Sequence, residues 1–152
     1  MATVKFQIST RNSGRLRTIQ VYVYATKKHM ERAGCHNHEY CGKGCVLDPP
    51  ETRADGKIFE LHALTQTFLK KTVSKGGLVR RQRPAGYMRF YRAHISVEVI
   101  SHEATHMAVW IYKTDVQKTI PDMEREEKLC YLVGDIAQKI NDGLYRHKVL
   151  VK

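Results

Sequence analysis

The amino-acid sequence predicts one small α+β domain, and three observations support this. Two segments near the N-terminus alternate apolar and polar residues, a further strand-like segment lies in the middle, and the last third changes to a period of three to four residues. Strands followed by helices are typical of the α+β class. We expect a small, mostly antiparallel N-terminal sheet packed on two long C-terminal helices, with residues 1–152 forming a single domain.

The first half of the chain is expected to supply the sheet. Alternation and β-branched or aromatic residues predict strands over Val4–Ser9 and Thr18–Tyr24, and the intervening RNSGR predicts a hairpin turn. The other expected elements are a short helix over Thr26–Arg32, a strand within Lys57–Phe68 and a strand over Tyr87–His94. Two long loops are expected between them: residues 34–55, rich in Cys and His, and the basic residues 69–86.

The last third predicts two amphipathic helices. Along Ser96–Tyr112 the apolar stripe consists of Val97, Ile100, Ala104, Met107 and Ile111. Asp122 is the expected N-cap of the second helix, which should end near Asn141–Gly143. Its stripe consists of Leu129, Leu132, Val133, Ile136 and Ile140.

The charge of the chain indicates an anionic partner. Lys and Arg number 26 against 15 acids, a formal charge of +11, which favours an acidic protein or nucleic acid. No helix-turn-helix or aromatic RNA-binding motif accompanies the charge, so nucleic acid rests on charge alone. We expect a cytoplasmic protein without membrane partners, because the sequence has no apolar run of about 18 residues and begins without a secretory h-region.

The segment His102-Glu103-Ala104-Thr105-His106 predicts a zinc site. Two histidines four residues apart lie on one face of a helix, so both imidazoles can bind one Zn²⁺. Glu103 follows the first ligand and is placed to act as general base on zinc-bound water. The alternative is a pair of histidines on a solvated helix face.

Zinc requires a third protein ligand, and a metzincin-type third histidine is excluded because Tyr112 stands at that position. The candidates are acids at the start of the second helix, Glu124, Glu126 and Glu127. Helical periodicity places Glu126 nearest the core stripe and Glu127 on a face with Tyr131 and Gly134, so the residues alone leave the choice open.

SHEATHMA followed by EEKLCYLVGDI resembles a group of small zincin-like proteins of bacteriophage and prophage genomes, which pair an HExxHxA helix with a later E-x-x-A-Y-L helix. More distantly it is similar to the gluzincins, among them thermolysin-like enzymes and repressor-cleaving immunity peptidases. The resemblance covers mainly the last third of the chain, and it implies a zincin-like fold in a bacterial or phage-infected host cytoplasm. It does not name a substrate.

The resemblance also assigns roles to individual residues. His102 and His106 match the histidine ligands, Glu103 the general base, and Glu127 the third ligand. Tyr131 is similar to a residue that orients a ligating histidine through a hydrogen bond. The chain departs from the pattern at Cys130, where Ala is usual, and we expect that thiol to pack in the core.

Two further groups of residues are candidates for function. A second, structural zinc is one interpretation of the C-x5-C-x3-C spacing with interleaved histidines, and free thiols are the other. The residues concerned are Cys35, His36, His38, Cys41 and Cys45. His94, at the end of the expected strand, is a candidate substrate contact, with a packing or capping role as the alternative.

Three functions follow from these features. The first is a zinc metallopeptidase in which Glu103 activates water and an extended protein substrate, acidic in keeping with the charge, lies along Tyr87–His94. The second is a non-catalytic zincin scaffold that uses its basic surface to bind a host protein or nucleic acid. The third is a zinc hydrolase acting on another kind of bond.

Overall fold

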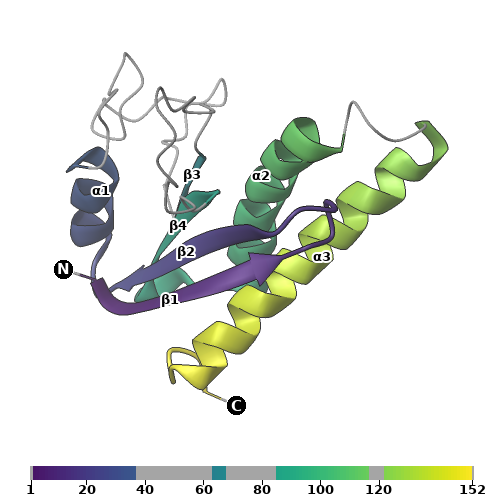
Figure 1. Cartoon of the computed structure of the whole chain (residues 1–152). Helices are drawn as coiled ribbons and strands as arrows, with labels where there is room; N and C mark the ends of the chain where they lie inside the picture. Colours follow the sequence, from purple (N-terminus) through teal and green to yellow (C-terminus); the bar gives the residue numbers. More distant parts are fainter. Residues whose placement is uncertain (1, 37–62, 68–84, 117–121, 152) are drawn as a thin grey trace, which may run out of the picture.

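The computed structural model describes residues 2–36, 63–67, 85–116 and 122–151. These residues form four strands, one 3-10 turn and three helices (Figure 1). In chain order they are β1 (Ala2–Thr10), β2 (Arg17–Tyr24), α1 (Lys27–His36), β3 (Ala63–Thr67), β4 (Gly86–Tyr91), η1 (Arg92–His94), α2 (Val97–Asp115) and α3 (Asp122–Arg146). The predicted α+β class is therefore confirmed.

The strands form one sheet with the order β1-β2-β4-β3. The β1–β2 and β3–β4 pairs are antiparallel and β2–β4 is parallel, so the sheet is mixed with mostly antiparallel pairing. The predicted hairpin is confirmed, and Gly14 in its turn has a φ of 83°, which an L side chain rarely adopts. The parallel β2–β4 pair requires a long crossover, and the chain supplies α1 and β3 between these strands.

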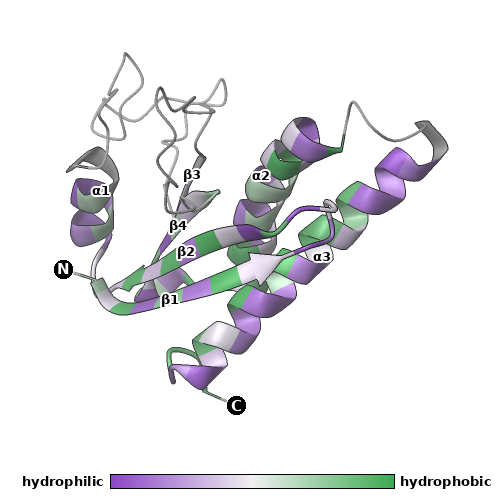
Figure 2. Ribbon diagram, viewed as in Figure 1, coloured by the Kyte–Doolittle hydropathy of each residue, from purple (hydrophilic) through white to green (hydrophobic). Residues whose placement is uncertain are grey.

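One face of the sheet packs against α2 and α3 and forms the main core. Alternate residues of β2 and β4 enter this core together with the apolar stripes of both helices. Figure 2 shows apolar and polar residues alternating along the strands. The fully buried members are Ile19, Val21, Val23, Met88, Phe90, Ala104, Met107, Ala108, Ile111, Leu132, Ile136, Ile140 and Leu144. Both predicted helical stripes thus contribute core residues.

The opposite face of the sheet is partly covered by α1. A second, smaller cluster forms there from Tyr24, Met30 and Tyr91. Arg89 of β4 is fully buried on this side and hydrogen-bonds Tyr24. Burial raises the pKa of the Tyr24 hydroxyl, although the nearby Arg89 charge opposes that effect. The sheet therefore has an apolar face against two helices and a polar, aromatic face beside α1.

The helices extend further than their sequence patterns predicted. α2 begins after Ser96 and continues to Asp115, and α3 continues through Gly143 to Arg146. The prediction that this helix ends at Asn141–Gly143 was wrong, because Gly143 lies inside the helix and packs against the sheet instead of ending the helix. A Cβ at this position would lie 2.2 Å from the Phe6 ring of β1, so a glycine inside the helix permits close contact with the sheet.

A buried ion pair joins the hairpin turn to the end of α2. The Asp115 carboxylate accepts hydrogen bonds from both Arg17 Nε, at 2.8 Å, and Arg17 Nη2, and another at 2.8 Å from Ser13 Oγ. The Arg17 guanidinium also lies 5.8 Å from the centre of the Trp110 ring. This contact fixes the position of α2 relative to the sheet.

The expectation that Tyr87–His94 offers a free strand edge was wrong. β4 is paired on both sides, to β2 and to β3, and residues 92–94 form the turn η1. Among the described strands β3 is the one at the edge beside α2, and Thr65 Oγ1 donates a hydrogen bond of 3.4 Å to the Glu103 carbonyl. The edge next to the candidate site therefore belongs to residues 63–67.

Most of both long loops lies outside the described residues, as residues 37–62 and 68–84 do. The expected helix over Thr26–Arg32 is confirmed and continues to His36.

None of the helices in the described ranges is long and apolar enough to cross a membrane.

Candidate metal centre

Helix α2 positions the HExxH residues in its first half. It begins where the Ser96 side chain accepts a 3.2 Å hydrogen bond from the Val99 backbone N–H, and Glu98 in the first turn complements the helix dipole. Ile100, Met107 and Ile111 anchor its inner face in the core. This anchoring leaves the face that carries His102 and His106 exposed to solvent.

The two histidines converge on one point outside the helix. Their Nε2 atoms lie 3.0 Å apart, and their ring centroids are separated by 4.7 Å at an interplanar angle of 77°. The i,i+4 spacing places one imidazole above the other, as the sequence requires. In the absence of a metal, this geometry permits one ring to donate a hydrogen bond to the other.

The distance between the histidine nitrogens fits a shared tetrahedral zinc. Two Zn–N bonds of about 2.0–2.1 Å at a tetrahedral angle separate the nitrogens by about 3.3 Å. The 3.0 Å found between His102 and His106 is within a small side-chain rotation of this value. The pair is therefore close to the conformation that zinc binding needs.

Glu103 is the nearest acid in sequence to this pair, and it is buried with 6% exposure. Among the described residues, no side chain forms an ion pair or hydrogen bond with its carboxylate, whereas Asp115 in the same helix binds Arg17 and Ser13. Among the described residues, the buried side-chain nitrogen and oxygen atoms without a hydrogen-bond partner belong to Arg89 and not to Glu103. Unlike Asp115, Glu103 is therefore not held in an ion pair with a described residue.

The structure does not bring the expected third ligand to the histidines. Glu124, Glu126 and Glu127 are all exposed on the first turns of α3. Within the described part of the chain, no three His, Cys, Asp or Glu residues are close enough to hold a metal together. Figure 1 shows why: the first turns of α3 extend outward, away from α2, and the two helices approach each other farther along.

The packing of α3 also corrects the expected faces of its acids. Leu132 and the residues that follow it at helical spacing are buried, and the half-buried residues of the first turns are Arg125, Lys128 and Leu129. Glu126 is exposed and does not lie nearest the core. Tyr131 is 63% exposed and shares an exposed face with Glu127 and Gly134, as the spacing indicated.

Two other candidates lie on the surface. His94 is exposed in η1, with its ring centroid 4.6 Å from that of Tyr91. Cys130 is an exposed free thiol, so the expected core packing was wrong. The reason is its position on α3, because the buried stripe passes through Leu129, Leu132 and Val133 and leaves residue 130 on the outer face.

The second expected metal site lies almost entirely outside the described residues. His38, Cys41 and Cys45 fall within residues 37–62, and only the backbone of Cys35 and His36, at the end of α1, is described. The structural zinc therefore stays a prediction.

The burial of Glu103 was not predicted, although the sequence contains a signal for it. Glu103 lies three residues after Ile100 and four before Met107, which places it on the buried face of the helix. Arg89 had a comparable signal, because it occupies the strand position between Met88 and Phe90, whose side chains enter the main core. Its side chain therefore points to the opposite face of the sheet.

Comparison of the chain with protein-family models, with curated proteins and with solved structures gives no match.

Proposed function

We propose that this protein is a zinc-dependent metallopeptidase with His102 and His106 as metal ligands and Glu103 as the general base. The observation that supports this most directly is the convergence of the His102 and His106 Nε2 atoms at 3.0 Å on the helix that also carries Glu103.

Each residue contributes a separate step. Bound zinc would supply a Lewis acid that polarises the substrate carbonyl and acidifies water. The two imidazoles hold the metal in their neutral form. Glu103 accepts the proton of the attacking water and donates it to the leaving amine. Thr65 on β3 hydrogen-bonds the backbone at Glu103, so an extended substrate strand beside β3 would lie next to the reacting groups.

The third ligand in this proposal is Glu127, which is chosen by resemblance, with Glu126 as the alternative. Because neither acid joins the histidines in the structure, zinc binding through α3 requires its first turns to come nearer to α2. The net charge of +11 favours an acidic protein or peptide substrate.

Metal content per chain tests the site. Protein purified without an affinity metal should contain about one zinc at the histidine pair. His102→Ala should lose it, while His29→Ala, which removes an exposed histidine from α1, should retain it. If the two variants bind equal amounts, the histidine pair is not the site. A further zinc lost only in Cys41→Ala would identify the structural ion.

Turnover tests the role of Glu103. We expect Glu103→Gln to keep its zinc and to lose peptide hydrolysis by about 10²–10⁴-fold, because the general base is removed. Glu98→Gln, which changes an exposed acid of the same helix, should leave the rate unchanged. Peptide hydrolysis that survives in Glu103→Gln contradicts the proposal. Zinc-dependent cleavage of esters but not peptides would instead favour a hydrolase of another bond.

A further inference from the structure

The two sides of the molecule differ in charge. Helices α2 and α3 contain nine acids and five Lys or Arg residues. The four strands contain Lys5, Arg17 and Arg89 and no acid. On the far side of the sheet from α2 and α3, helix α1 adds Lys27, Lys28 and Arg32 with Glu31. Within the described helices and strands, bases therefore outnumber acids in the sheet and α1 and acids outnumber bases in α2 and α3, although Arg17 is paired with Asp115 of α2.

A row of cations and aromatic rings crosses the sheet on the α1 side. Lys5 of β1, Tyr22 of β2 and Arg89 of β4 are cross-strand neighbours. Lys5 Nζ lies 5.4 Å from the centre of the Tyr22 ring, and Arg89 Cζ lies 5.7 Å from the same centre. The Tyr22 ring is thus flanked by two positive charges.

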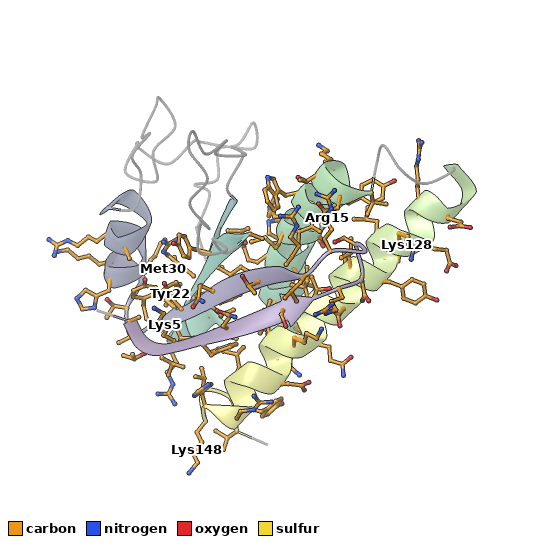
Figure 3. All side chains as sticks on the ribbon, in the orientation of Figure 1. Lys5, Arg15, Tyr22, Met30, Lys128 and Lys148 are labelled. Carbon is orange, nitrogen blue, oxygen red and sulfur yellow. The ribbon has the colours of Figure 1, made fainter. Side chains whose placement is uncertain are left out.

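Further polar and aromatic side chains extend this row into a surface. The Tyr87 ring lies edge-on to Tyr22 at 5.9 Å, and Gln20 Nε2 donates a 2.6 Å hydrogen bond to Gln7 Oε1. We call the surface of Lys5, Gln7, Gln20, Tyr22 and Tyr87 the aromatic face. Lys5 and Gln7 are exposed, and Gln20, Tyr22 and Tyr87 are half-buried. Figure 3 shows Lys5 and Tyr22 together, beside Met30 of α1.

We propose that the aromatic face binds single-stranded nucleic acid, an activity separate from the metal centre. Aromatic rings with neighbouring cations on a sheet accept unstacked bases, and the exposed Lys5 is placed to contact a phosphate, whereas the buried Arg89 supports the Tyr22 ring from within. The charge of the surface supports this partner. The four strands contain no Asp or Glu, so they present no negative group that would repel a polyanion. The bases of a duplex are already stacked on each other, so a duplex would use only the charges.

Fluorescence anisotropy with the full-length protein tests this proposal. The probe is a labelled oligothymidylate of about 16 nucleotides, measured against a duplex with the same number of phosphates and against polyglutamate as competitor. We expect the single strand to bind more tightly than the duplex and to resist competition by polyglutamate at equal charge. Its log K should fall linearly with log salt.

Matched variants assign the binding to the aromatic face. Lys5→Glu should weaken binding about tenfold through lost phosphate contacts, and Tyr22→Leu about tenfold through lost stacking. Lys113→Glu makes the same charge change at an exposed site on α2 and should change binding less than about twofold. Glu103→Gln should bind as the wild type does, which separates this activity from hydrolysis.

Four results would overturn the proposal: no binding at low salt, equal affinity for the duplex, displacement by polyglutamate at equal charge, or equal losses in Lys5→Glu and Lys113→Glu. Circular dichroism establishes that each variant is folded. If Tyr22→Leu fails to fold, the comparison of Lys5→Glu with Lys113→Glu still decides the outcome, because both residues are exposed.

Discussion

Two carboxylates of α2 are buried in different surroundings. Asp115 accepts hydrogen bonds from Arg17 and Ser13, whereas the Glu103 side chain has no such partner among the described residues. Burial alone raises the pKa of Asp115, but the hydrogen bonds from Arg17 and Ser13 and the positive charges of Arg17 and Arg15 together outweigh it and hold that pKa below its ordinary value. The Arg17 pKa is raised, chiefly by its hydrogen bonding to Asp115. Asp115 is therefore a structural acid.

The lowered pKa of Asp115 predicts how stability depends on pH. Its stabilising contribution is fully present above the unfolded-state pKa of about 3.9 and is lost as pH falls through the lower folded-state value. Asp115→Asn should therefore reduce stability by about 1–3 kcal/mol at neutral pH, and the difference should shrink in acid. Urea unfolding between pH 2 and pH 7 measures this.

Asp135→Asn is the control for this prediction. Asp135 pairs with Lys139 one turn away on the partly exposed side of α3, at 2.8 Å. Such pairs contribute only about 0.3–0.5 kcal/mol. If both variants lose the same free energy of unfolding, the ion pair between Arg17 and Asp115 contributes no more to stability than an exposed pair does.

Local sequence patterns predicted most secondary-structure elements but not their partners. Alternation identified β1 and β2, and the turn residues between them identified the hairpin. The parallel pairing of β2 with β4 was not predictable, because it depends on a crossover through residues whose periodicity is weak. The i,i+4 spacing predicted that His102 and His106 converge. The distance from this pair to the acids of α3 was not predictable, because it depends on the angle at which α2 and α3 pack.

The two glycines of α3 predict opposite effects of the same substitution. Gly143→Ala places a Cβ 2.2 Å from the Phe6 ring, and we expect overpacking of about 1–3 kcal/mol to exceed the helix-propensity gain of about 1 kcal/mol. A Cβ added at Gly134 would have no atom within 4 Å apart from its chain neighbours and its own helix backbone, so Gly134→Ala should stabilise the protein by about 0.5–1 kcal/mol. Thermal and urea unfolding measure both changes.

A second-site change identifies the cause of the Gly143 effect. Phe6→Leu removes the ring from the contact, so Gly143→Ala should cost less in that background than in the wild type. If the cost is the same in both backgrounds, the Phe6 ring is not what excludes a larger residue.

In the molecule as a whole, the candidate metal centre and the aromatic face lie on opposite sides of the sheet. The first belongs to α2, which packs on the apolar face, and the second lies on the face that α1 partly covers. This arrangement allows a nucleic-acid strand and a protein substrate to be bound at once without competing for the same surface. It also makes α3, with its outward first turns, the element whose position matters most for the metal centre.

Zinc binding should therefore slow amide exchange in the first turns of α3, although these turns lie away from the histidines in the structure. If Glu127 completes the site, its turn of α3 must be held against α2, and amide exchange in the first turns of α3 should slow when zinc is added. Hydrogen exchange followed by mass spectrometry measures this segment separately from the rest of the helix. Glu127→Gln should abolish the protection and Glu126→Gln should retain it, whereas His102→Ala should remove every effect of zinc at this site. Protection confined to α2 would instead mean that the third ligand does not come from α3, because a metal held by the histidine pair alone has no means of ordering a helix that it does not contact.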